Sequence, residues 1–193
     1  MELDTRPTRD QALLALVVKE ADATSRSGAG YLGRTAMQKI LYFLQVCNVP
    51  MRYRFSVHHY GPFCANILSD IDWLLFTGDL KDGSNNREKY SNYRLTDEGE
   101  ALIERFEKEL SPHHDVIKTI VPTLVKVKPI QLELISTMHY AYRELDASKK
   151  FTPTRENVFE RFKEFKEDKF EGEELEMAYD LLSECDLIDT PDE

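Results

Sequence analysis

Three side chains able to bind a metal ion, or to act as nucleophile and base, lie close together in the sequence: His58, His59 and Cys64. A zinc site or a Cys-His dyad needs such side chains to converge on one point. Adjacent residues of a strand point to opposite faces, so His58 and His59 do not readily bind the same metal ion. The chain also has no Cys-x-x-Cys or spaced histidine pair to complete a metal site. We therefore expect no metal, no cofactor and no catalytic residues.

A second candidate chemistry is the binding of phosphate groups by basic side chains. The window from Thr24 to Ser69 contains neither Asp nor Glu. Lys and Arg near a nucleic acid release condensed counterions whatever its base sequence. We expect the basic residues of this window, one amide at the start of a helix and the cations of a β-hairpin to bind nucleic acid. These residues are Arg26, Arg34, Lys39, Arg52, Arg54, Asn66, Arg87, Lys89 and Arg94.

The helix expected to follow Pro62 weakens this interpretation. It contains Asp70 and Asp72, and no Lys or Arg occurs between Phe63 and Leu80. A helix that reads a DNA groove usually supplies Arg, Lys, Asn or Gln to base edges. The sequence therefore leaves two hypotheses open: binding to double-stranded DNA, and reuse of the same scaffold for binding a protein or a second copy.

The net charge of −10 is unevenly distributed along the chain. Residues 151–193 contain 5 Lys or Arg against 15 Asp or Glu, whereas residues 1–150 contain 20 of each. An acidic helical half is suited to contacts with itself or with a protein partner. The hydrophobic content of 41% is typical of a globular protein, and the odd number of 3 cysteines favours reduced thiols. The sequence has no apolar run of membrane-spanning length, and we expect a cytoplasmic protein.

Hydrophobic periodicity and capping signals predict the elements that position these residues. Thr8 with Gln11, and Thr35 with Gln38, have capping-box spacing before apolar helical patterns. A strand at 55–58 is expected to lead through Gly61-Pro62 directly into a third helix that ends at Gly78. Two strands near 80 and 90–95, and a helix from Thr96 to about Leu110, complete the expected elements of this half.

This order predicts a mainly α fold of α+β type. Residues 1–111 are expected to form a winged helix-turn-helix domain with a small antiparallel β wing. Ser111-Pro112 marks the expected boundary, and residues 112–193 are expected to form an acidic helical bundle for assembly or partner binding. Pro129 and Thr154 are well placed to begin helices of that bundle.

Three segments together resemble the YwgA family of uncharacterised prokaryotic proteins. They are residues 38–44 (QKILYFL), 59–63 (HYGPF) and 132–139 (LELISTMH), followed by the closing helices of residues 162–188. The first helix and the Tyr-Gly-Pro corner are more distantly similar to the Panacea domain of SocA-like antitoxins. Because Panacea-type proteins neutralise toxins by binding them, the resemblance implies a regulator-like protein that is not an enzyme. It carries no functional residues over to this chain.

We therefore expect a regulatory DNA-binding protein that forms a homodimer, the commonest assembly for this kind of protein. The alternative is an antitoxin-like or scaffold protein that binds another protein without touching DNA. An enzyme is a third class, and the cluster of His58, His59 and Cys64 is its only support.

Overall fold

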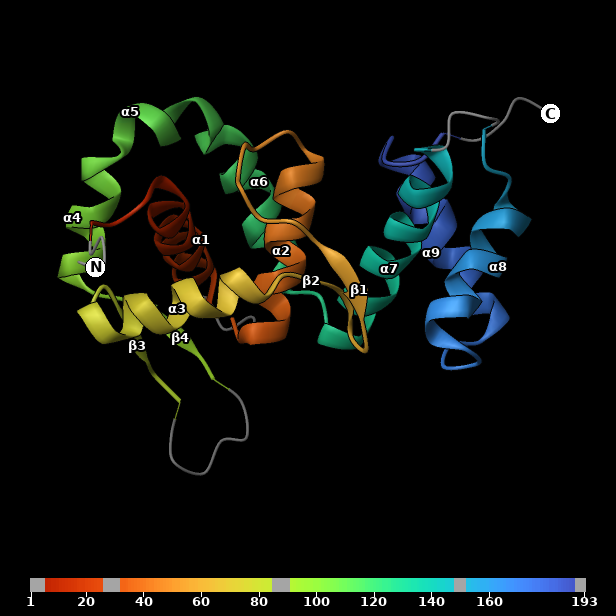
Figure 1. Cartoon of the computed structure of the whole chain (residues 1–193), viewed down its shortest axis with the longest axis horizontal. Coiled ribbons are helices and arrows are strands. Elements are labelled where there is room, and N and C mark those ends of the chain that lie inside the picture. Colours follow the sequence, from red (N-terminus) through yellow and green to blue (C-terminus); the bar gives the residue numbers. More distant parts are fainter. Residues whose placement is uncertain (1–5, 26–31, 85–90, 148–151, 190–193) are drawn as a thin grey trace, which may run out of the picture. The chain divides into compact units, whose positions relative to one another are not determined.

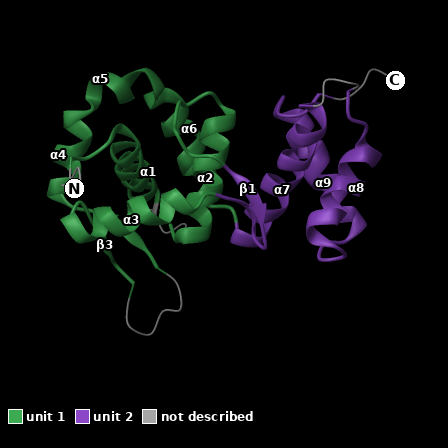
Figure 2. Cartoon of the chain, viewed as in Figure 1, with its two compact units in different colours: residues 1–54, 64–127 green, residues 55–63, 128–193 purple. Residues whose placement is uncertain are grey.

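The computed structural model describes residues 6–25, 32–84, 91–147 and 152–189. They are mainly helical, with two small antiparallel sheets (Figure 1), and this confirms the predicted fold class. The chain divides into two compact units (Figure 2). Unit 1 comprises Met1–Arg54 and Cys64–Val127, and unit 2 comprises Phe55–Phe63 and Lys128–Glu193. The units thus do not divide at the expected Ser111-Pro112 boundary.

Unit 1 is built around its first helix. Its elements are α1 (Arg9–Ser25), α2 (Arg34–Val46), α3 (Ala65–Thr77), β3 (Leu80–Asp82), β4 (Tyr93–Leu95), α4 (Asp97–Arg105), α5 (Glu107–Leu110), the 3-10 turn η1 (Ser111–His113) and α6 (His114–Leu124). Helix α1 packs against α3, α4, α5, α6 and β4, and most of its side chains are buried. Helix α6 packs on α1 and α2, which explains why unit 1 continues past Pro112.

The two predicted capping boxes have different outcomes. In α1 the box is present: the Thr8 amide donates to Gln11 Oε1 at 2.8 Å, and the Gln11 amide donates to Thr8 Oγ1 at 3.3 Å. In α2 the prediction is wrong, since the N-cap is Gly33 and has no side-chain hydrogen bond. The Gln38 amide instead binds the Cys64 backbone, donating to its carbonyl at 3.0 Å and accepting from its N–H at 2.9 Å.

The segment after Arg54 also differs from its prediction. Gly61-Pro62-Phe63 does not open a helix but forms β2 (Gly61–Phe63), which pairs antiparallel with β1 (Ser56–His58). Gly61 has φ 85°, a left-handed conformation that glycine adopts without steric cost, at the turn between the two strands. Helix α3 begins two residues later than Phe63, at Ala65. This hairpin belongs to unit 2.

The second hairpin of the chain agrees with its prediction. β3 and β4 pair antiparallel, with Leu80 opposite Leu95. Helix α3 ends at Gly78 in the left-handed conformation, and the Thr96 side chain caps α4 by accepting from the Gly99 amide at 3.2 Å. A Cβ added to Gly99 would lie 2.3 Å from the Asp79 carbonyl oxygen, so the start of α4 approaches the α3–β3 connection too closely for a larger residue.

The described residues of unit 2 form the β1–β2 hairpin and the helices α7 (Pro129–Asp146), α8 (Arg155–Lys166) and α9 (Gly172–Glu184). Pro129 is the first residue of α7, and Thr154 forms a capping box with Asn157 at the start of α8, as expected. Helix α7 packs against α8, α9 and β2. It is buried on two sides, and Met138, His139 and Ala141 are among its buried residues.

Candidate functional site

The predicted nucleic-acid-binding residues do not form one exposed basic surface. Arg26, Arg87 and Lys89 lie outside the described residues. The prediction for Lys39 is wrong, because this side chain is only 2% exposed in a helix that is buried almost all round. The remaining five residues are described and are at least partly exposed: Arg34, Arg52, Arg54, Asn66 and Arg94.

Two of these arginines are held by carboxylates on other elements of unit 1. Arg34 Nε donates to the Tyr93 hydroxyl at 3.1 Å, and Nη2 lies 3.6 Å from Asp72 of α3. The hydrogen bond to Tyr93, followed by the nearby acidic groups, raises the pKa of Arg34. Arg94 of β4 pairs with Asp22, whose second carboxylate oxygen accepts from the Leu95 amide. Each positive charge is thus balanced locally, which reduces its attraction for phosphate.

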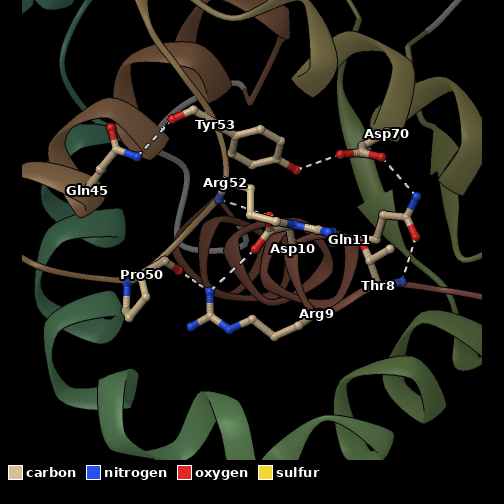
Figure 3. Close-up of polar contacts among 9 residues, drawn as sticks. All are labelled: Thr8, Arg9, Asp10, Gln11, Gln45, Pro50, Arg52, Tyr53 and Asp70. Carbon is tan, nitrogen blue, oxygen red and sulfur yellow. Dashed lines mark hydrogen bonds and ion pairs between the residues drawn. The ribbon is translucent and has the colours of Figure 1, made fainter.

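A third arginine lies in a polar network at the start of α1 (Figure 3). Asp10, only 4% exposed, accepts from both the backbone amide and the Nε of Arg52, at 3.0 and 3.2 Å. Arg9 of the same helix turn donates to the Pro50 carbonyl. These bonds fix the segment that follows α2 onto α1, so Arg52 has a structural role.

The network extends to α3 through one tyrosine. Tyr53 is buried, its hydroxyl donates to Asp70 Oδ2 at 2.8 Å, and Gln11 donates to the other oxygen of Asp70 at 2.9 Å (Figure 3). Burial, and then the Asp70 carboxylate, raise the pKa of the Tyr53 hydroxyl, so this group stays protonated. Asp70 therefore joins α3 to α1 and is turned inward, unlike Asp72.

The outward face of α3 combines an acid with an aromatic side chain. Ala65, Ser69, Asp72 and Phe76 lie at helical spacing on this face, and all are exposed. Phe76 in the last turn is 89% exposed, which is unusual for a phenylalanine. The face includes no cation from α3 itself, since α3 contains neither Lys nor Arg. Its chemistry suits a protein surface better than a phosphate backbone.

The histidine and cysteine cluster is divided by the fold. His58 and His59 are exposed on the β1–β2 hairpin of unit 2, whereas Cys64 is buried in unit 1 as the N-cap of α3. The rings of His58 and Phe63 are in tilted contact with centroids 4.8 Å apart, and the rings of His59 and Tyr60 are in edge-to-face contact at the same distance. Among the described residues, no group of three His, Cys, Asp or Glu side chains is arranged to hold a metal ion.

Sequence patterns did not reveal a buried charged cluster in unit 2. Glu133 of α7 accepts from Lys166 at 2.6 Å and from Lys169 at 2.7 Å, and the side chains of Glu133 and Lys166 are 4% and 2% exposed. Lys166 also donates to the His59 carbonyl at 2.5 Å. Burial alone would raise the pKa of Glu133, but the hydrogen bonds from both lysines lower it. The cluster therefore joins α7, α8 and the β1–β2 turn.

The chain can now be compared with known proteins. No family model matches the chain. The chain is similar to the uncharacterized protein YwgA of Bacillus subtilis (strain 168). The two sequences are 25% identical over 111 residues, which cover 56% of this chain and 64% of YwgA. The predicted resemblance to YwgA is thus confirmed.

The similarity to YwgA adds no activity, because that protein is itself described as uncharacterized. The match spans less than two thirds of YwgA and leaves the more distant similarity to the Panacea domain as an expectation. Within the described part of the chain, no helix combines the length and apolar character needed to cross a membrane.

Proposed function

We propose that this chain is a non-enzymatic regulatory binding protein in which unit 1, a winged-helix variant, contacts a protein partner through the outer face of α3. The order α2, α3, β3 and β4, with α3 ending directly before the hairpin, supports the winged-helix assignment. The observation that carries the proposal is the exposure of Phe76 beside Asp72 on a helix that contains no Lys or Arg. Aromatic side chains often dominate the binding energy of protein interfaces.

The first test uses Phe76→Asp in the full chain. We expect this variant to lose a stoichiometric partner that copurifies with the wild-type protein from its native cells, by about tenfold or more, as for interface hot spots. Quantitative mass spectrometry of the purified material measures the loss. Because Phe76 is 89% exposed, the variant should keep the wild-type unfolding curve.

The matched control is Ile130→Asp, which places the same charge at a 45% exposed apolar residue of α7. It should retain the partner. Equal recovery of the partner with Phe76→Asp and with wild type, both folded, would show that the α3 face is not the binding surface.

DNA binding by the same module is the second candidate function, and two exposed residues favour it. Arg54 forms no ion pair with another described residue, and Asn66 is exposed in the first turn of α3. Arg54 is also the better residue to change, because a glutamate at Arg52 would face the buried Asp10 carboxylate.

We expect fluorescence anisotropy with random duplex DNA to show no salt-sensitive binding. The reason is that Arg34, Arg52 and Arg94, three of the arginines predicted to bind nucleic acid, are already paired with carboxylates. The measurement compares wild type with Arg54→Glu at two salt concentrations. Salt-sensitive binding that Arg54→Glu weakens, with a salt slope reduced by about 1 or more, would favour the DNA hypothesis instead.

A further inference from the structure

Helix α9 of unit 2 has an outward face that unit 2 leaves uncovered. Met177 is 72% exposed and Leu181 is 47% exposed, and their i, i+4 spacing places them side by side. The opposite face is buried through Leu175, Ala178 and Leu182. Helix α9 therefore has one apolar face that packs in the core of unit 2, and a separate pair of apolar side chains on its exposed face.

Acidic side chains surround this apolar pair. Glu173 and Glu184 lie one turn before Met177 and almost one turn after Leu181, both exposed and neither ion-paired with a described residue. Asp180 lies on the same face and pairs with Arg155 at 2.7 Å. Helix α9 itself contains five acidic residues and no Lys or Arg. The face thus combines an apolar centre with a negative rim.

This pattern selects one kind of occupant by charge complementarity. A second copy that met the same face around a twofold axis would bring the Glu173 and Glu184 carboxylates of the two copies toward one another, and like charges placed together cost several kcal/mol at an interface. Nucleic acid would be repelled by the same carboxylates. A segment with apolar side chains flanked by Lys or Arg would satisfy both the centre and the rim.

We propose that the outer face of α9 docks a basic, amphipathic helical segment of a partner protein, with Met177 and Leu181 as its apolar anchors. This surface lies in unit 2 and does not include α3, so it extends the proposed function and can fail independently of it.

The test uses the full chain and a fluorescent synthetic peptide in which pairs of leucine and lysine alternate to form a basic amphipathic helix. A scrambled peptide of the same composition, without an apolar face, is the control ligand. We expect the amphipathic peptide to bind more tightly than the scrambled one and to lose affinity as salt rises. Met177→Gln with Leu181→Gln should weaken binding by about tenfold or more, since two buried anchors are lost.

Two further variants separate the apolar centre from the charged rim. Glu173→Gln with Glu184→Gln should weaken binding several-fold and flatten its salt dependence, because the rim loses its charge. Ile130→Gln, at an exposed apolar residue of α7, should leave the affinity unchanged. Equal binding of both peptides, or unchanged binding by the Met177 and Leu181 double variant, would overturn the proposal. The proposal would also be overturned if sedimentation velocity showed that the wild-type protein is a dimer and that the double variant is a monomer.

Discussion

Replacing Glu133 with glutamine is expected to lower the free energy of unfolding by about 3 to 5 kcal/mol, the usual cost of removing one partner from a buried ion pair. The carboxylate receives hydrogen bonds from Lys166 and Lys169, and Lys166 is almost fully buried. Glutamine keeps the shape of the side chain but removes its charge. The Lys166 ammonium could still donate to the glutamine amide oxygen and to the His59 carbonyl, but its buried positive charge would lack a counter-ion.

Urea unfolding followed by circular dichroism measures this effect. Glu164→Gln is the matched control, because Glu164 pairs with Arg161 at the surface and is 62% exposed; it should cost about 0 to 1 kcal/mol. Glu133→Leu combined with Lys166→Met removes both buried charges and should recover much of the loss. A loss below about 1 kcal/mol for Glu133→Gln would mean that another group compensates Lys166.

Acidification from pH 7 to pH 4 is expected to cost the protein about 3 kcal/mol of stability through His139 alone. Burial in α7, followed by the charge of Arg143, lowers the pKa of His139 from 6.5 to about 4, against a hydrogen bond with the Leu187 backbone that raises it. The unfolded chain therefore binds more protons than the folded chain between these two values. The contribution of the neutral His139 side chain to the free energy of unfolding is therefore fully present above pH 6.5 and is lost as the pH falls toward 4.

The measurement is urea unfolding at a series of pH values for wild type and for His139→Gln. Other groups also titrate in this range, so the informative quantity is the difference in pH slope between the two proteins. We expect the variant to have the flatter slope, because it lacks the buried imidazole. His58→Gln, at an exposed histidine, is the control for the loss of an imidazole as such. A parallel pH dependence of wild type and His139→Gln would contradict the role of His139.

The elements that the sequence predicted well are those with local causes. The capping residues of α1, α4 and α8 and the left-handed Gly78 act within one helical turn, so a short segment determines them. The false capping box at Thr35 shows the limit of such reasoning. Gln38 had the right spacing, but the backbone of Cys64, brought close by the fold, is its actual partner. A local sequence pattern does not show whether a side chain will bond to a residue nearby in the chain or to one that the fold brings close.

The same limit explains the errors in the candidate site. Counting charge along the window from Thr24 to Ser69 counted Arg34, Arg52 and Lys39 as available cations. Arg34 and Arg52 are paired with Asp72 and Asp10, outside that window, and α2 buries Lys39. The exposure of Phe76 and the Glu133 cluster were equally invisible, since apolar and charged residues at helical spacing occur both inside and outside a fold. Burial decides their roles.

The position of the β1–β2 hairpin in the chain has a consequence for folding during synthesis on the ribosome. It is synthesised between α2 and α3, yet its packing partner α7 and the lysine that holds its turn are synthesised more than sixty residues later. Because chains emerge from the N-terminus first, unit 1 can be complete while this hairpin still lacks its partners. A nascent chain ending near Val127 would contain β2 without the helix α7 that packs on it, and would leave this strand accessible to chaperones until α7 is synthesised.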